Sequence, residues 1–413
     1  MIILNRVMVT GMGAVTPIGN DVESCWQSLV AGKCGIGAIT KFDTTDFKVK
    51  VAAEVKDFEP ARYMDKAELR KFDPFCQYAM GAAAQAVESS GILGKCAPEE
   101  VGVYFGSGIG GITTFEEQQK LMLEKGPRRV SPFFIPALII NMAGGLIAIK
   151  YNFQGAAVSS VTACATGNNA IGEAYRAIKH GYLTAALAGG AEAAIVPLGL
   201  AGFSNMKALS TCEDPAAACV PFDARRGGFV MGEGAGILLL ESLEHALARK
   251  ADIYAEIVGY GATCDAYHMT APLSDGSGGA KAMAQALADG GVEPEAVDYI
   301  NAHGTSTHLN DAGETAAVKT VFGPHAYQLA ISSTKSMTGH MLGAAGAVEA
   351  IFTAMALKDG FIPATIHYQT PDPECDLDIV PNQGRTADIR CALSNSLGFG
   401  GHNGSLLFRK WEG

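Results

Sequence analysis

A strand-turn-helix unit that occurs twice limits the folds open to this chain. In the first copy, Val158-Ser159-Ser160 leads into a helical pattern that ends at Lys179-His180-Gly181. In the second, Ile331-Ser332-Ser333 leads to a helical pattern that ends at Lys358-Asp359-Gly360. A basic last turn followed by glycine is a common end of a helix. The spacing differs between the two copies, yet their likeness favours a fold made of two similar halves.

Strands and helices alternate along the rest of the chain. Apolar runs at Val101–Phe105 and Gly236–Glu241 predict buried strands, and the pattern at Asp73–Ser90 predicts a helix stopped by a glycine. Such alternation indicates layered α/β architecture. With 413 residues the chain exceeds the roughly 250–300 residues of a usual single core. We therefore predict two halves, residues 1–250 and 251–413, packed as one compact unit.

Cys164 lies where the first copy turns from strand into helix, after a run that we expect to be a buried strand. Amides at a helix N-terminus carry partial positive charge, which favours the thiolate and can hold an oxyanion. A buried, inert cysteine is the commoner alternative. Two later turns rich in Gly, Ser and Thr each carry a histidine, His303 and His340. One nucleophile and two imidazoles together favour nucleophilic catalysis.

These three stretches together resemble the β-ketoacyl-[acyl-carrier-protein] synthases, the condensing enzymes of fatty-acid synthesis. The resemblance runs from Val7–Gly11 to Gly398–Gly404, over nearly the whole chain. It implies the thiolase fold, with two similar halves in a five-layered αβαβα arrangement with mixed sheets. It also implies a 3-oxoacyl synthase that elongates long acyl chains by decarboxylative Claisen condensation, since the initiating type would carry Asn where this chain has His340.

The resemblance also assigns roles at the site. Cys164 would take the acyl group, while His303 and His340 would hydrogen-bond the malonyl thioester carbonyl. Loss of CO₂ would drive the reaction, so no cofactor is implied. Other residues would support the site, line its acyl pocket or bind the pantetheine arm: Lys335 and Glu349 electrostatically, Phe399 through its backbone amide, Ile109 and a partner subunit's Phe134 in the pocket, and Thr305 and Thr307 on the arm.

Local basic residues contrast with a net charge of −11, which argues against nucleic acid as the main ligand. A solvated face is their default interpretation. The resemblance implies instead that they dock an acidic acyl carrier protein, loaded with acyl or malonyl groups. The residues in question are Lys66, Arg70, Arg128, Arg129 and Lys207.

The most apolar long stretch is Phe133–Ile149, which contains Pro136 and Asn141. It is shorter than the roughly 20 residues that span a bilayer. We interpret it as a buried interface helix of a homodimer and not as a membrane segment. The ten cysteines are scattered without a CxxC pair, and no basic region precedes an apolar core at the start. Reduced thiols and a cytoplasmic protein are therefore expected.

A dinucleotide-binding oxidoreductase is the strongest rival, because Gly106–Gly111 fits G-x-G-x-x-G after a strand. That fingerprint also needs an acidic residue about 20 positions on, at the end of a second strand. Glu124 comes too early, and no strand follows it. The rival is therefore weak.

Two further alternatives concern a metal and the pathway. His303 and His308 with Asp311 and Glu314 suggest a metal site, but a spacing of five between histidines is uncommon for zinc, and we predict none. A polyketide-type ketosynthase would use the same chemistry and stays open. Chain preference also stays open, because Leu397 stands where some relatives have Phe.

Overall fold

The computed structural model describes residues 4–413, and ten of its strands make up one large sheet. The first half contributes β1 (Val7–Val15), β4 (Val101–Gly106), β5 (Ala157–Val158), β6 (Ala185–Glu192) and β7 (Gly234–Ser242). The second half contributes β8 (Ala255–Cys264), β9 (Tyr299–Asn301), β10 (Ala330–Ser332), β13 (Cys391–Gly398) and β14 (His402–Lys410). Two small hairpin-like sheets pair β2 (Gly37–Ala38) with β3 (Val51–Ala52), and β11 (Phe361–Ile362) with β12 (Arg385–Thr386).

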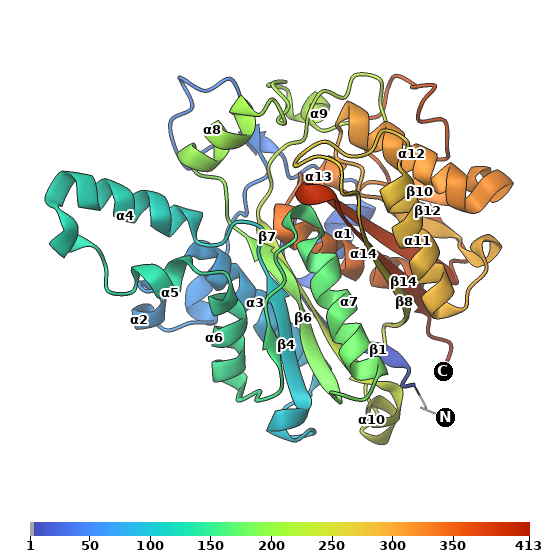
Figure 1. Cartoon of the computed structure of the whole chain (residues 1–413), viewed down its shortest axis with the longest axis horizontal. Coiled ribbons are helices and arrows are strands. Elements are labelled where there is room, and N and C mark those ends of the chain that lie inside the picture. Colours follow the sequence, from blue (N-terminus) through green and yellow to red (C-terminus); the bar gives the residue numbers. More distant parts are fainter. Residues whose placement is uncertain (1–3) are drawn as a thin grey trace.

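Helices cover both faces of this sheet (Figure 1). In the first half they are α1 (Val22–Val30), α2 (Lys66–Leu69), α3 (Pro74–Ser90), α4 (Ile112–Lys125), α5 (Phe134–Leu138), α6 (Asn141–Tyr151), α7 (Thr166–Lys179), α8 (Pro197–Asn205), α9 (Pro215–Ala218) and α10 (Leu243–Ala248). In the second half they are α11 (Ser277–Gly290), α12 (His308–Phe322), α13 (Lys335–Thr338) and α14 (Ala345–Asp359).

The two halves have the same topology. From the middle outward, the first half runs β1-β7-β6-β4-β5 and the second runs β8-β14-β13-β9-β10. In both, the innermost two pairings are antiparallel and the outer two are parallel. A short antiparallel pairing of β1 with β8 joins the halves into one continuous sheet. This confirms two similar halves, whereas the boundary at residue 250 stays a prediction.

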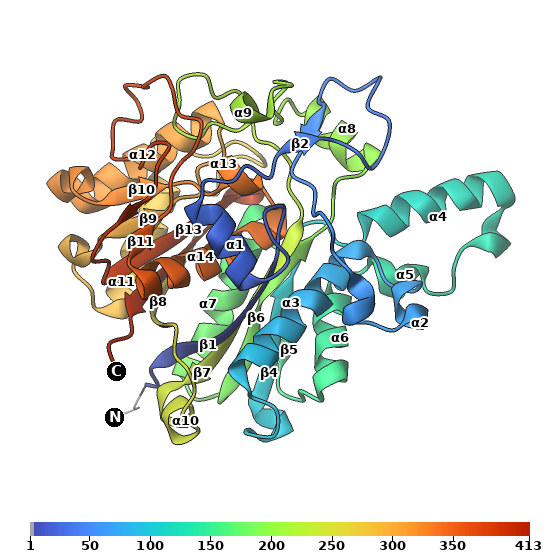
Figure 2. The same cartoon turned by 180° about the vertical axis from the view of Figure 1, so that it is seen from behind.

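The helices form three layers around the two half-sheets. α3 and α6 cover the outer face of the first half-sheet, and α11 with α12 covers the second. In chain order, α7 comes after β5 and α14 after β10, each the third strand that its half contributes to the large sheet. The two helices pack against each other in the middle. Figure 1 views the first half-sheet from the α7 side, and Figure 2 views it from the α3 side. The result is the expected five-layered αβαβα order.

Paired glycines bring the outer helices close to the innermost strands. A Cβ on Gly13 of β1 would lie 1.9 Å from the carbonyl oxygen of Ala82 on α3. In the second half, a Cβ on Gly261 of β8 would lie 1.9 Å from the carbonyl oxygen of Ala282 on α11. No side chain fits at either place, so both helices rest directly on the strand backbone.

The expectation of a buried strand before Cys164 is wrong. Only Ala157–Val158 pairs with a neighbour, β4, and the run forms the outer edge of the sheet. Val158 and Val161 are 45% and 51% exposed. Its outer side chains stay uncovered because, within residues 4–413, no other strand lies beyond it.

The apolar stretch Phe133–Ile149 also differs from the single buried helix that we expected. It divides into α5 and α6, because Ile139 adopts an extended conformation at the end of α5. Ile135 is 57% exposed and Ile149 77% exposed. With α4, α5 forms an arm that projects from the body of the molecule (Figures 1 and 2). Across residues 4–413, every helix is too short or too polar to cross a membrane.

Candidate active site

A cavity of about 340 Å³ opens where the two halves meet, and it brings together the three groups singled out in the sequence. Cys164 comes from the first half, whereas His303 and His340 come from turns of the second half. Phe399, in the turn between β13 and β14, also lines the cavity. Neither half therefore contains the whole site.

Cys164 lies in a tight turn directly before α7. Its own backbone amide and that of Phe399 both act on the sulfur and favour the thiolate, as expected for an oxyanion-binding pair. Burial nevertheless raises the pKa of the Cys164 thiol to about 12, although the charge of Lys335 and both amides lower it. The amides at the helix N-terminus thus favour the thiolate in the expected direction, but desolvation is the larger effect.

The two imidazoles lie beside each other and are uncharged. Burial lowers the pKa of both His303 and His340 well below the usual value, and the positive charge of Lys335 lowers it further. Within residues 4–413, Nδ1 of His303 and both ring nitrogens of His340 have no hydrogen-bond partner. Buried polar atoms are normally paired. The hydrogen-bonding capacity of these nitrogens is therefore not used within the described part of the protein.

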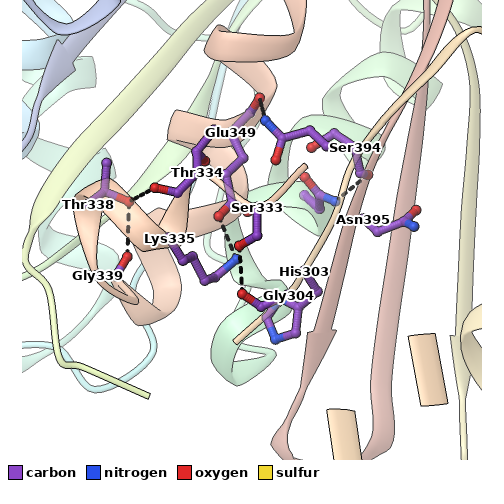
Figure 3. A network of polar contacts seen from close by, with 12 residues as sticks. His303, Gly304, Ser333, Thr334, Lys335, Thr338, Gly339, Glu349, Ser394 and Asn395 are labelled. Atoms are coloured by element: carbon purple, nitrogen blue, oxygen red, sulfur yellow. Dashed lines mark hydrogen bonds and ion pairs between the residues drawn. The ribbon is translucent and has the colours of Figure 1, made fainter. Parts of the chain in front are cut away.

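Hydrogen bonds between side chains and backbone groups fix the turns that carry the histidines. Glu314 accepts hydrogen bonds from the amides of His303 and Gly304, at 2.8 Å each. The Ser333 hydroxyl donates to the carbonyl of Gly304 at 2.6 Å, which ties the His303 turn to the segment leading to His340 (Figure 3). Our sequence analysis considered Glu314 only as a metal ligand and did not identify Ser333.

Lys335 and Glu349 form a fully buried ion pair next to the histidines (Figure 3). The ammonium nitrogen lies 2.5 Å from Oε1 of Glu349. Burial raises the pKa of Glu349 to about 7, and Lys335 opposes this rise. The pair accounts for a carboxyl group in an otherwise apolar helix, because a buried charge needs a partner.

Glu192 was missed by the sequence analysis, although it organises the glycine-rich loop. Its carboxylate accepts hydrogen bonds from the Ser107 hydroxyl and from the amides of Gly108, Ile109 and Gly343. A dinucleotide phosphate would need such amides, and here an internal carboxylate occupies them. The signal was present: a carboxyl group at the end of a buried strand requires partners.

Apolar side chains surround Cys164 on its inner side. Ile109 packs in one cluster with Cys164, together with Ile195 and Leu342. Phe134 does not join this cluster. It lines a separate groove of about 250 Å³ between α2 and the α4–α5 arm.

The metal alternative finds no support in the contacts of its residues. Asp311 accepts a hydrogen bond from the Phe222 amide at 2.8 Å, and Glu314 holds the His303 turn. No group of three or more His, Cys, Asp or Glu side chains is placed to hold a metal ion anywhere in residues 4–413. Thr305 and Thr307 line the cavity and hydrogen-bond to each other at 2.9 Å.

All five candidate docking residues are exposed. Lys66 and Arg70 lie in and directly after α2, and Arg128 and Arg129 lie in the turn after α4. α2 lies beside the arm in the fold, where its basic end and the arm line one groove. Lys207 lines the mouth of the catalytic cavity.

Comparison with known proteins gives a consistent family assignment. A family model described as "Beta-ketoacyl synthase, N-terminal domain" matches residues 4–246, and one described as "Beta-ketoacyl synthase, C-terminal domain" matches residues 254–369. The 3-oxoacyl-[acyl-carrier-protein] synthase 2 of Synechocystis sp. is 53% identical over 98% of this chain and 98% of its own length. That of Staphylococcus aureus is also 53% identical, over 98% of this chain and 99% of its own.

Solved structures of similar fold include other ketosynthases. The ishigamide ketosynthase/chain length factor has a TM-score of 0.93 and 39% identity, covering 99% of this chain and 100% of its own. A type II polyketide ketosynthase, solved in complex with its acyl-carrier protein and bound to the hexaketide, has a TM-score of 0.92 and 36% identity, with the same coverage.

Proposed function

Because this chain belongs to the β-ketoacyl synthase family, we propose that Cys164, His303 and His340 are its catalytic groups. The chain is an acyl-transferring condensing enzyme, a 3-oxoacyl-[acyl-carrier-protein] synthase. The observation that carries the residue assignment is the single cavity in which one thiol meets two neutral imidazoles with unpartnered nitrogens.

The first half-reaction loads the acyl group. The sulfur of Cys164 attacks the thioester carbon of an acyl-carrier, and the carbonyl oxygen becomes an oxyanion. The amides of Cys164 and Phe399, which both lower the pKa of the thiol, stabilise that oxyanion. The intermediate collapses to an acyl-Cys164 thioester, and the thiol proton leaves on the carrier's thiol.

The second half-reaction forms the new carbon–carbon bond. His303 and His340 donate hydrogen bonds to the thioester carbonyl of malonyl-carrier, so that loss of CO₂ leaves a stabilised enolate. Its carbon attacks the acyl carbon on Cys164, and the same two amides hold the second oxyanion. Collapse releases the sulfur, which regains a proton, and the 3-oxoacyl-carrier departs. A neutral imidazole suits this role because it donates a hydrogen bond to the carbonyl without giving up its proton.

Mass spectrometry after incubation with an acyl-carrier tests the assignment. We expect the acyl label on Cys164 alone. Cys164→Gln should lose condensation yet still release CO₂ from malonyl-carrier, because the amide resembles an acyl carbonyl. Cys25→Ser is the matched control: this thiol is also buried and donates to a carbonyl that a serine can reach. A label on another cysteine, with Cys164 unmodified, would refute the assignment.

The partner class is an acyl carrier protein, and one structural relative was solved in complex with its own. We propose that this chain docks its carrier on Lys66, Arg70, Arg128, Arg129 and Lys207. Their exposure and their positive charge on an acidic protein support this surface, because an acidic partner would be attracted to it.

We further propose that the protein is a homodimer. Uncovered apolar side chains on the edge strand β5, on α5 and on α6 support this proposal. A monomer rarely exposes so much apolar surface in one region, and a bare sheet edge favours association. Two-fold pairing is the commonest way to cover such a surface.

A polyketide-type ketosynthase is the second candidate, favoured by the type II polyketide ketosynthase among the solved structures. The higher identity to fatty-acid enzymes favours fatty-acid elongation. A series of saturated acyl-carriers and poly-β-keto carriers, each supplied with malonyl-carrier, separates the two. We expect elongation of the saturated series.

A further inference from the structure

A chain of two hydrogen bonds reaches from the second half of the protein to the turn before Cys164. The hydroxyl of Tyr260 on β8 donates to Oδ1 of Asn169 on α7 at 2.9 Å. Nδ2 of Asn169 then donates to the hydroxyl oxygen of Thr162 at 2.8 Å. Tyr260 is 2% exposed and Asn169 is also buried, which keeps water from the first bond, whereas the second bond is partly buried because Thr162 is half-buried.

The turn before Cys164, which these two hydrogen bonds reach, has an unfavourable backbone conformation. Ala163, between Thr162 and Cys164, has φ of +49°, in the left-handed region that residues with a Cβ rarely adopt. Local bonds close the turn, since the amide of Thr162 donates to the Thr166 hydroxyl at 2.9 Å. A strained backbone persists only where surrounding contacts hold it.

The turn also touches the segment that supplies the second oxyanion amide. A Cβ on Gly398 would lie 2.7 Å from the carbonyl oxygen of Thr162 and 3.2 Å from the amide nitrogen of Cys164. Phe399 follows Gly398 directly. A shift of Thr162 would therefore change the distance between the amides of Cys164 and Phe399.

We propose that Tyr260, Asn169 and Thr162 are positioning residues that hold the Cys164 turn against the Gly398–Phe399 segment. The proposal rests on the proposed function of Cys164. It predicts that breaking either hydrogen bond displaces the amide of Cys164 relative to that of Phe399, so that the thiol ionises less readily and the oxyanion is bound less well. The two histidines take no part in these hydrogen bonds, and their role should be unaffected.

The test compares three rates in the full-length protein. They are alkylation of Cys164 by iodoacetamide, acylation of Cys164 from an acyl-carrier, and CO₂ release from malonyl-carrier. Tyr260→Phe removes only the hydroxyl donor. We expect alkylation and acylation to slow by about three- to tenfold, the effect of one lost hydrogen bond, while CO₂ release stays within twofold of the unmodified protein.

Tyr175→Phe is the matched control. The Tyr175 hydroxyl also joins α7 to β8, through the carbonyl of Val258 at 2.7 Å, but it does not contact the Cys164 turn. Its loss should leave all three rates unchanged. Equal slowing in Tyr175→Phe and Tyr260→Phe would overturn the proposal, because general packing of α7 on β8 would then explain the effect.

Thr162 provides a second variant in case Tyr260→Phe fails to fold. Thr162→Val should slow alkylation and acylation, Thr162→Ser should restore them, and Tyr260→Phe with Thr162→Val should be no slower than the slower single variant. Additive effects, or rates like those of the unmodified protein, would overturn the proposal. If the unmodified protein takes no acyl group, the proposed function fails, and the alkylation rates still decide the positioning role.

Discussion

The imidazole rings of His303 and His340 meet edge to face, with centroids 5.3 Å apart and an angle of 84° between the rings. Burial and the nearby Lys335 ammonium lower the pKa of both rings well below the ordinary value near 6.5. At neutral pH both are therefore uncharged, and a proton on either would face a second positive charge. This arrangement determines how activity and stability depend on pH.

We predict that CO₂ release from malonyl-carrier by Cys164→Gln is constant from about pH 8 to pH 6. A free histidine would titrate near pH 6.5, whereas these two keep their neutral form below that value. The release of CO₂ measured across this range checks the prediction. A loss of activity centred near pH 6.5 would contradict it.

The same shifts affect folding stability with a definite sign. Below about pH 6.5 the unfolded chain protonates His303 and His340, whereas the folded chain does not, so the unfolded state binds more protons. The two histidines therefore contribute stability that is lost as the solution is acidified through this region, whereas Glu349, with a pKa raised to about 7, contributes in the opposite sense. Urea unfolding at pH 7.5 and pH 6 separates the two: replacing His303 and His340 together by Gln should remove the loss on acidification, with His308→Gln, which alters an imidazole at the cavity rim, as the control.

Replacing Lys335 by Met should be costly because it leaves Glu349 buried without its partner. Loss of one member of a buried ion pair costs about 3–5 kcal/mol of unfolding free energy. Lys335→Met with Glu349→Gln removes both charges and should cost less. In the single variant the pKa of both histidines should rise, although burial, the larger cause, still holds them below the usual value. Equal stability of the single and double variants would contradict an interaction between the two side chains.

The local parts of the fold and site could be predicted from the sequence. Cys164 follows a β-branched run and precedes a helical pattern; His303 lies in a turn after strand β9, and His340 in a turn after the short helix α13. Such signals span few residues, so they survive without knowledge of the tertiary structure. The repeated strand-turn-helix unit likewise predicted two halves of the same topology, which the strand order confirms.

What escaped prediction depends on contacts between distant residues. Glu192 meets the Gly108 amide across 84 positions, and the depth at which Cys164 is buried depends on both halves. No local pattern reports either. The exposure of Val158 was also missed, since an apolar run looks the same whether its cover comes from its own chain or from another.

The docking surface can be tested by charge reversal. Arg128→Glu with Arg129→Glu should raise KM for carrier-linked substrates several-fold, and more at low salt, where charges are screened less. A small acyl thioester without the carrier should react as before. Arg390→Glu is the control, because Arg390 is exposed at the other end of β13 from the cavity. Equal losses on carrier-linked and small substrates would indicate damage to the fold.

The shared acyl pocket can be tested at its two expected ends. If a partner's Phe134 closes the pocket near Ile109, Phe134→Ala should lengthen the acyl chain that is accepted, and Ile109→Phe should shorten it. Competition between acyl-carriers of different length measures this preference. Sedimentation of the unmodified protein should give a dimer at micromolar concentration. A fully active monomer would end both proposals, whereas an unchanged chain preference would remove only the shared pocket.

The contact between the two halves has a consequence for the order in which a gene can encode them. The guanidinium of Arg6 lies 5.4 Å from the ring centre of Trp411, so residues near the two ends of the chain are neighbours. The chain passes from α10 to β8 through a surface turn, where Lys250 is exposed. A circular permutant that joins the old ends and opens this turn would place the histidine half before the cysteine half in the gene. The reaction requires the two halves to be in contact, whichever half the ribosome makes first.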